Sequence, residues 1–495
     1  MFHYIQKIKG MGEKNMENNL IYGVHDRPPF GKTLIFAFQQ LLAILAATIA
    51  VPAIVGNGMS QSAALFGAGI GTIVYLLFTK FKSPVFLGSS FAFIGSMLAA
   101  FAGGVSMSVG YLGLIIGAVL AGLVYVILAL IVKKFGVGWV NKLMPAVVVG
   151  PTVAIIGLSL AGNAIGDLFA GGLKDAAGAS VCNPYIAVLC GLVTLGVTIA
   201  CSVYGKKMVK MIPFILGILA GYALAAIFTG FGHLFNVDAL KVINFGLFAD
   251  IKWYPDFTFL TAFKGFGEFT WARLGTIAVA YVPVAFVVFA EHIADHKNLS
   301  TVIGSDLLVD PGLDKTLLGD GVGSMVGAIF GGCPNTTYGE SVGCVAISRN
   351  ASVSTIFTTA IMCIVASFVG PFVTFLATIP SCVMGGVCIA LYGFIAVSGL
   401  KMIQDVDLND NRNLFVVSVI LIAGIGGMTL SFGQVTITEV ACALILGILT
   451  RVLVSFKKDN KEEVIETKTT EEDKVEEKVI SEDTVTVEVK TEEDK

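Results

Sequence analysis

The chain has 495 residues, 55% of them hydrophobic and only 14% charged, with a mean hydropathy of +0.84 and a formal net charge of −3. Ordinary soluble domains carry about 25% charged residues, and a water-soluble fold could not cover this much apolar surface. The composition therefore excludes a soluble globular protein and indicates a chain that crosses the lipid bilayer repeatedly, with no sign of a nucleic-acid partner.

The first apolar run begins near Leu34, after a segment of residues 1–33 that is expected to lie in the cytoplasm. It begins too late and is too long for a cleaved signal peptide, so we interpret it as a retained span. Runs of about 17 to 25 apolar residues can cross a bilayer as helices. They occur near 34–55, 62–79, 110–132, 144–162, 184–203, 211–232, 274–296, 354–378, 383–400, 412–430 and 435–455, with shorter or interrupted runs near 84–102, 318–332 and 338–350. Together they predict fourteen spans in a transmembrane domain of residues 34–456.

Basic residues indicate the orientation of these spans. Lys80, Lys82, Lys133 and Lys134 lie in loops that alternate with short loops without Lys or Arg, near 56–61, 103–109, 379–382 and 431–434. Short loops rich in Lys and Arg face the cytoplasm, and an even number of spans places both termini on that side. Residues 457–495 hold 8 Lys and 15 Asp or Glu in low-complexity order, so we predict an acidic, disordered cytoplasmic tail.

Two segments interrupt their apolar surroundings with Pro, Gly and hydroxyl residues. They are SPVFLGSSFAF, residues 83–93, and GGCPNTTYGESVG, residues 331–343, one in each half of the chain. Backbone that leaves the helix at membrane depth must be buried in protein or line a cavity. Paired interruptions of this kind point to the midplane site of a transporter, so we predict a ligand site where the two segments meet.

Three acidic residues lie near these interruptions. Glu340 belongs to the second one, and Glu291 and Asp295 are four residues apart in a predicted span, which places them on one face of a helix. A carboxylate at the centre of a membrane helix costs about 2.5 to 3.5 kcal/mol. We therefore predict that all three acids face a cavity and function there.

Other ionisable residues of the spans are weaker candidates for a functional role. His296 lies one position beyond the face of Glu291 and Asp295 and is a third candidate for proton coupling, although both it and His292 also fit a packing or helix-end role. Asp320 is expected at the membrane interface, before a shortened span.

Buried acids without a matching Lys or Arg in the spans favour a neutral ligand that donates N–H groups. A planar lactam such as uracil has two ring N–H groups and two carbonyls, and free backbone N–H groups near Phe91 and Gly339 could donate to the carbonyls. Removal from water disfavours the charged form of a carboxyl group, so one of the acids could bind and release a proton during transport. The nine Cys, none in C-x-x-C spacing, indicate no disulfide framework, metal site or cofactor.

The motifs of the chain resemble those of the nucleobase-ascorbate transporter family. The matching stretches cover about residues 22–456 and exclude the tail, and the combination of PNTTYGE with FAEHI is the most specific. They are GVHDRPPF before the first span, FLGSSFAFI at 86–94, FAEHI at 289–293, DLLVDPGL at 306–313, PNTTYGE at 334–340 and VMGGV at 383–387.

The resemblance implies an all-α polytopic fold of fourteen transmembrane segments in two inverted seven-span repeats, with short strands in spans three and ten. A core domain of approximately 34–133 and 274–378 would hold the base. A gate domain of approximately 144–232 and 383–456 would complete the fold. Similar family members are proton symporters of the bacterial cell membrane, frequently homodimers, and not enzymes.

Residue roles follow from motif positions. Glu291 would hydrogen-bond the base and Glu340 would accept from a ring N–H; the other substrate-binding candidates are Phe91, Gly339, Tyr338 and Ser90. Glutamate at 340 favours the uracil-type members, so the expected function is proton-coupled import of uracil. A xanthine or uric acid symporter remains an alternative, as does an anion exchanger or channel on the same fold.

The chain also departs from the family pattern at three places. Gln39-Gln40 stands where relatives often have Gln-His, and Asp295 stands where uracil permeases frequently place His, with His296 shifted by one. Ser341 and Ser348 replace the usual Asn and Thr. The first two departures leave the proton path open.

Overall fold

The computed structural model describes residues 20–136, 145–175, 179–206, 208–404, 406–432 and 435–455. The predicted tail, 457–495, and most of the N-terminal segment lie outside the described residues. The helices are α2 (Phe30–Val55), α3 (Gln61–Phe78), α4 (Ile94–Phe101), α5 (Met107–Phe135), α7 (Ala146–Ser159), α8 (Ala161–Leu168), α9 (Pro184–Tyr204), α10 (Met208–Met211), α11 (Pro213–Leu234), α12 (Thr258–Ala262), α13 (Trp271–Ile303), α14 (Leu313–Gly331), α15 (Gly339–Ser348), α16 (Val353–Ser367), α17 (Gly370–Thr378), α18 (Ser381–Met402), α19 (Asn411–Ile425) and α20 (Glu439–Ser455).

The long helices have the length and composition of membrane spans. Within the described part of the chain, eight are long and apolar enough to cross a bilayer, or nine if α16 and α17, bent by 83° at their junction, form one span. Their outer faces are apolar: Leu123, Ile127 and Leu130 of α5 are all about half exposed, as expected for side chains in contact with lipid. The protein is therefore a multi-pass membrane protein of mostly helical fold, whereas the count of fourteen spans stays a prediction.

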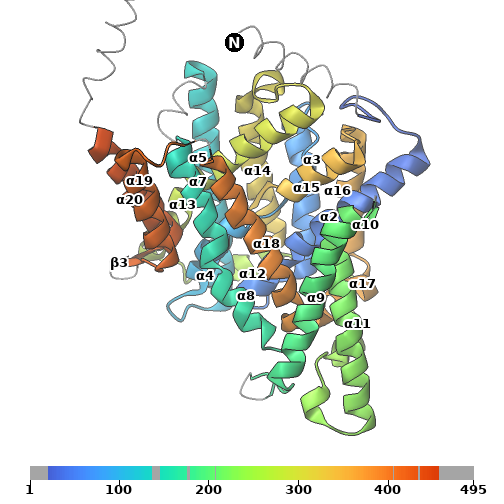
Figure 1. The fold of residues 1–495 in the computed structure, drawn as a ribbon. Helices are drawn as coiled ribbons and strands as arrows, with labels where there is room; N and C mark the ends of the chain where they lie inside the picture. The colour runs from blue at the N-terminus through green and yellow to red at the C-terminus, as the bar shows by residue number, and fades with distance from the viewer. Residues whose placement is uncertain are drawn as a thin grey trace, which may run out of the picture.

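By their contacts, the helices form two sets, which overlap in the view of Figure 1. In one set, α14 packs against α3 and α5, and α16 packs against α2 and α3, while α13 lies against α5. In the other set, α18 packs against α7, α8 and α9, α11 lies beside α9, and α19 and α20 pack together against α7. Two helices of the first set make most of the contacts between the sets. α2 touches α11 and α18, and α13 touches α7 and α20.

Two short strands cross within the first set. β1 (Leu87–Ser89) pairs antiparallel with β2 (Asn335–Thr337), with Gly88 opposite Thr336. Each strand belongs to one of the interrupted segments, and each is followed by a helix: β1 by the 3-10 turn η1 (Phe91–Phe93) and α4, and β2 by α15. Two segments almost 250 residues apart in the sequence therefore meet inside the helix bundle. A second hairpin, β3 (Leu430–Phe432) with β4 (Val435–Ile437), joins α19 to α20.

Side chains of neighbouring helices bind the backbone that the strands leave unpaired. The Thr72 hydroxyl of α3 lies 2.9 Å from the Leu87 N–H and 3.1 Å from the Leu87 carbonyl. In the opposite direction, the Asn335 side chain of β2 donates to the Gly67 carbonyl of α3 at 2.8 Å, which ties the strand to the same helix. Because no water is available in the bilayer core, such contacts are what allow extended backbone at this depth.

The N-terminal GVHDRPPF stretch also has a defined place. Tyr22 forms a parallel bridge with Asn350, just after α15, and the Val353 N–H donates to the Val24 carbonyl at 3.1 Å. Backbone hydrogen bonds thereby hold the chain before the first helix against the loop between α15 and α16.

Candidate substrate site

A cavity of about 370 Å³ lies between the two helix sets, where the strand pair meets α13. This volume is within the range of about 300 to 1,000 Å³ that small-molecule sites have. Every predicted substrate-binding residue lines it, and so does Asp295. These residues are Ser90, Phe91, Glu291, Asp295, Tyr338, Gly339 and Glu340.

The backbone of the strand pair directs two helix starts at the cavity. η1 begins at Phe91, directly after β1 and Ser90, and α15 begins at Gly339, directly after β2 and Tyr338. The first N–H groups of a helix have no partner within the helix, and together with the helix dipole they favour an electron-rich ligand atom. The site therefore offers hydrogen-bond donors from two main-chain segments that approach from opposite directions.

The acids supply acceptors to the same space. Glu291 and Asp295 lie one turn apart on α13, and both side chains are partly exposed to the cavity. The Thr337 hydroxyl donates to Asp295 Oδ2 at 2.7 Å, which ties β2 to α13. Glu340 lies in the first turn of α15 and is also partly exposed. The cavity thus combines carboxyl groups with free N–H groups, the complement of a ligand that both donates and accepts.

Tyr338 forms a fixed wall of the cavity. Its hydroxyl donates to the Ser89 carbonyl at 2.8 Å, and only 4% of the residue is exposed. The ring lies against Gly88, where an added Cβ would come within 2.3 Å of two ring carbons. Gly88 is therefore needed for close approach between the two interrupted segments.

Phe91 also lines the cavity. It makes an edge contact with Tyr392 of α18, with ring centroids 5.8 Å apart.

Two of the departures from the family pattern are in contact with each other. Gln40 Nε2 donates to the Ser341 hydroxyl oxygen at 2.6 Å, and the Phe86 N–H donates to the same oxygen at 3.2 Å. Ser341 thus joins α2, the backbone before β1 and α15 directly behind the cavity wall.

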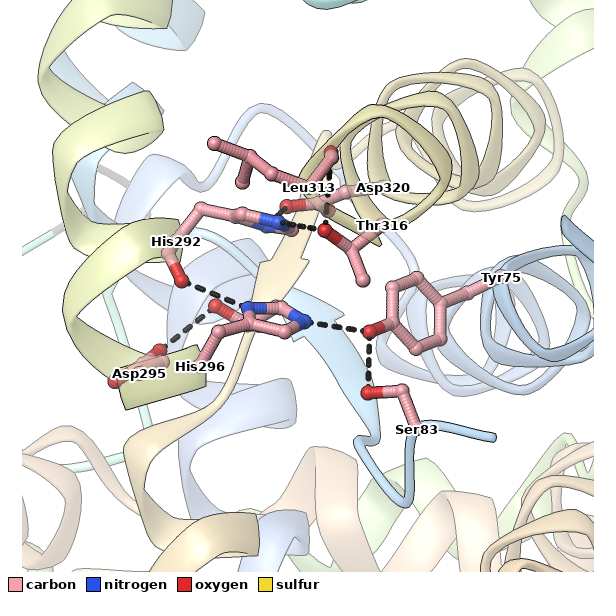
Figure 2. A network of polar contacts seen from close by, with 9 residues as sticks. Tyr75, Ser83, His292, Asp295, His296, Leu313, Thr316 and Asp320 are labelled. Atoms are coloured by element: carbon pink, nitrogen blue, oxygen red, sulfur yellow. Dashed lines mark hydrogen bonds and ion pairs between the residues drawn. The ribbon is translucent and has the colours of Figure 1, made fainter. Parts of the chain in front are cut away.

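His296 does not line the cavity. It is fully buried on the side of α13 that faces α3, with Nε2 2.7 Å from the Tyr75 hydroxyl and Nδ1 2.7 Å from the His292 carbonyl (Figure 2). Of the three residues predicted for proton coupling, the structure brings Glu291 and Asp295 to the cavity and places His296 in a separate hydrogen-bond network.

The expectation that Asp320 is interfacial is wrong. Asp320 is 1% exposed in the interior of α14, and its Oδ2 lies 2.7 Å from His292 Nδ1. The sequence around it, LGDGVGS, contains small residues that allow α14 to pack tightly against α3 and α5, and this packing buries the carboxyl group.

Sequence reasoning missed part of the cavity wall. Lys210 of α10, together with Ser202, Met211 and Phe214, lines it from the second helix set. In the sequence, Lys210 lies between the predicted spans 184–203 and 211–232, and nothing in its local sequence indicates that this connection folds against the cavity. Among the described residues, no group of three or more His, Cys, Asp or Glu could hold a metal ion.

Comparison with known proteins gives the class of the molecule. The sequence profile of the Permease family matches residues 31–432, so this chain belongs to that family of membrane transporters. The resemblance inferred from the motifs is thereby confirmed.

Relatives within the family are close over most of the chain. A uracil permease of Bacillus caldolyticus is 40% identical over 455 residues, which is 91% of this chain and 98% of the relative. The uracil permease of Bacillus subtilis (strain 168) is 38% identical, covering 90% of this chain and 97% of the relative. That of Escherichia coli (strain K12) is 36% identical, covering 86% and 92%, respectively.

Solved structures share the fold at low sequence identity. The transmembrane domain of the cyanobacterial bicarbonate transporter BicA has a TM-score of 0.58 at 15% identity, covering 87% of this chain and all of that domain. The murine anion transporter Slc26a9 has a TM-score of 0.59 at 11% identity, covering 87% of this chain and 69% of that protein. These likenesses concern the arrangement of the helices.

Proposed function

We propose that this protein imports uracil across the bacterial cell membrane together with protons. The single observation that carries the proposal is the shared cavity of Glu291 and Glu340, into which both helix starts also point. Relatives that are 35% to 40% identical over most of their length and are uracil permeases support the choice of cargo.

The chemistry of the cavity fits an uncharged lactam. Glu340 accepts one ring N–H of uracil, Glu291 hydrogen-bonds the opposite edge, and the N–H groups at the starts of η1 and α15 donate to the carbonyls. Ser90 borders the first of these helix starts, and Tyr338 contacts the ring plane. Each polar edge of the base then has a partner, which offsets the cost of removing it from water.

Transport requires the cavity to open alternately to each side. In the proposed mechanism, residues 34–133 and 274–378 form a core that carries the base, and residues 144–232 and 383–456 form a gate against which the core moves. The packing of the helices in two sets, with the cavity between them, supports this division. Glu291 and Asp295 bind the coupled proton in this scheme, and a homodimer would hold two gates fixed in the bilayer.

The orientation follows from the basic loops. Fourteen spans with cytoplasmic termini place Lys210 near the cytoplasm, and Lys210 lines the cavity. This arrangement corresponds to a carrier that is open toward the cytoplasm.

Anion exchange is the second candidate, because the fold is shared with a bicarbonate transporter and an anion transporter. Lys210 provides a positive charge at the cavity wall, but three carboxyl groups share that cavity with it, which opposes an anionic ligand. A xanthine or uric acid symporter differs only in the size and pattern of the base.

Uptake of radiolabelled uracil into proteoliposomes with an imposed pH gradient, acidic outside, tests cargo and driving ion together. We expect accumulation above equilibrium that an uncoupler abolishes. Uptake of radiolabelled xanthine by the same proteoliposomes without uptake of uracil would refute the choice of base, and gradient-independent uptake would refute proton coupling.

A further inference from the structure

A second, much smaller void lies behind the substrate cavity, between α5, α13, α14 and β2. Its volume is about 10 Å³, close to the roughly 10 to 15 Å³ that one water molecule needs. Its polar lining consists of Tyr125, Asp320, Ser324, Asn335 and Thr336.

Two polar atoms at this void have no hydrogen-bond partner among the described residues. They are Asp320 Oδ1 and Tyr125 Oη, and their residues are 1% and 4% exposed. A buried polar atom without a partner costs about 1 to 3 kcal/mol, and a buried carboxyl oxygen beside a hydroxyl group is a suitable pair of partners for one water molecule. The void therefore has the size and two of the polar partners that one water molecule requires.

The other oxygen of Asp320 belongs to a hydrogen-bond chain whose protons can be counted (Figure 2). The Thr316 hydroxyl lies 3.1 Å from the Leu313 carbonyl, which can only accept. When Thr316 donates there, His292 Nε2, 3.0 Å from the Thr316 oxygen, must donate to it. His292 Nδ1 and Asp320 Oδ2, 2.7 Å apart, then share one further proton, and the pair is neutral overall.

The same chain accommodates the loss of one of these two protons. The proton that remains is then on His292 Nδ1, which donates to an Asp320 carboxylate, and Nε2, now without a proton, becomes an acceptor. The Thr316 hydroxyl then turns from the Leu313 carbonyl to His292 Nε2, so every group in the chain keeps a partner in both forms. The pair carries one negative charge after release and regains neutrality by binding one proton.

Neighbouring groups keep this proton at Asp320 and His292. The His296 ring lies beside the His292 ring, with centroids 4.0 Å apart and the planes tilted by 30°, so two charged rings would repel strongly in this apolar interior. His296 Nδ1 faces a carbonyl and its Nε2 faces Tyr75, a pattern that the neutral ring satisfies. The other titratable groups around the pair are Tyr125 of α5 and, on the cavity side of α13, Glu291 and Asp295.

A route connects the void to the substrate cavity. Thr336 of β2 lines both, so this residue borders a water in the void on one side and the space that Glu291 and Asp295 face on the other. His292 follows Glu291 directly on α13 and points away from the cavity toward α14. The small void and the acids of the cavity are thus on two faces of the same helix turn.

We propose that Asp320 and His292 form a proton-storage site of this transporter, which exchanges its proton with the substrate cavity through one water molecule in the void and past Thr336. The proposal rests on the proposed function in that it assumes proton-coupled transport. Glu291 and Asp295 pass the proton to and from the cavity, while the stored proton travels with the core helices.

Asp320→Asn tests the storage site. Asparagine can donate to His292 Nδ1 and still bind the water, but it holds no transferable proton. In proteoliposomes, we expect Asp320→Asn to exchange labelled for unlabelled uracil without a gradient as the parent does, and to lose accumulation driven by a pH gradient. Accumulation equal to that of the parent would overturn the proposal. Failure of the parent itself to take up uracil would instead refute the proposed function.

If Asp320→Asn loses uracil exchange as well as accumulation, a second pair of variants tests the proposed proton route. Tyr125→Phe removes a hydroxyl from the void, whereas Tyr281→Phe removes an equally buried, unpartnered hydroxyl that lines neither the void nor the cavity. We expect slower gradient-driven accumulation in Tyr125→Phe and parental accumulation in Tyr281→Phe, with exchange retained in both. Identical accumulation by the two variants would overturn the proposed route.

Discussion

Gly88→Ala tests whether the contact between the two interrupted segments shapes the cavity. The added Cβ would lie 2.3 Å from Cε2 and Cζ of Tyr338 and 2.8 Å from its hydroxyl. Carbon atoms pack at about 3.5 to 4.0 Å, so the Tyr338 ring must move by more than about 1 Å, and its hydrogen bond to Ser89 cannot persist. Overpacking costs about 1 to 3 kcal/mol and loss of the hydrogen bond about 0.5 to 1.5 kcal/mol.

We therefore expect a loss of about 1.5 to 4.5 kcal/mol in stability, together with weaker uracil binding because the ring is pushed toward the cavity. Thermal unfolding of the purified protein and equilibrium binding of labelled uracil measure the two effects. Gly275→Ala is the matched control: it lies in α13, and its Cβ would meet no atom within 4 Å. A Gly88→Ala variant as stable as this control, with parental affinity, would refute the reasoning.

Three further substitutions address the site. Glu340→Gln should abolish or greatly weaken uracil binding, because a partial donor replaces an acceptor at the same volume; near-parental affinity in a binding assay would contradict the assigned role. Glu291→Gln should remove the response of uptake to a collapsed proton gradient and also weaken binding, whereas unchanged sensitivity to an uncoupler would assign the proton elsewhere. Ser341→Ala leaves the buried Phe86 N–H without its acceptor and leaves Gln40 Nε2 only the longer contact to the Ser341 carbonyl, at 3.4 Å. We therefore expect a loss of about 1 to 3 kcal/mol in thermal unfolding, and parental stability would show that another acceptor replaces the hydroxyl.

The sequence predicted the cavity because the physics of the bilayer leaves few alternatives. Pro and Gly beside hydroxyl residues in an apolar run force the backbone out of the helix, and the free N–H groups must then lie inside protein. Acids in the same runs must also avoid lipid. These two constraints place Glu291 and Glu340 near residues 83–93 and 331–343, and both acids line one cavity with residues of each segment.

The contacts made by tertiary packing could not be predicted in the same way. Asp320 follows a helix start and resembles an interfacial residue, but its glycine neighbours let α14 approach α3 and α5 closely enough to bury it against His292. Lys210 follows from no local pattern, because its place depends on how α10 folds against α2 and α15. His296 differs from Asp295 by one position, and that rotation of about 100° on the helix moves it from the cavity to Tyr75.

The most direct test of the account is a structure of the protein with uracil bound. We predict the base between Glu291 and Glu340, with at least one ring N–H donated to Glu340 and a carbonyl at the start of η1 or α15. A base bound elsewhere in the cavity, beside Lys210 and Ser202 and in contact with neither acid, would contradict the central claim that these carboxyl groups and the two helix starts recognise the substrate.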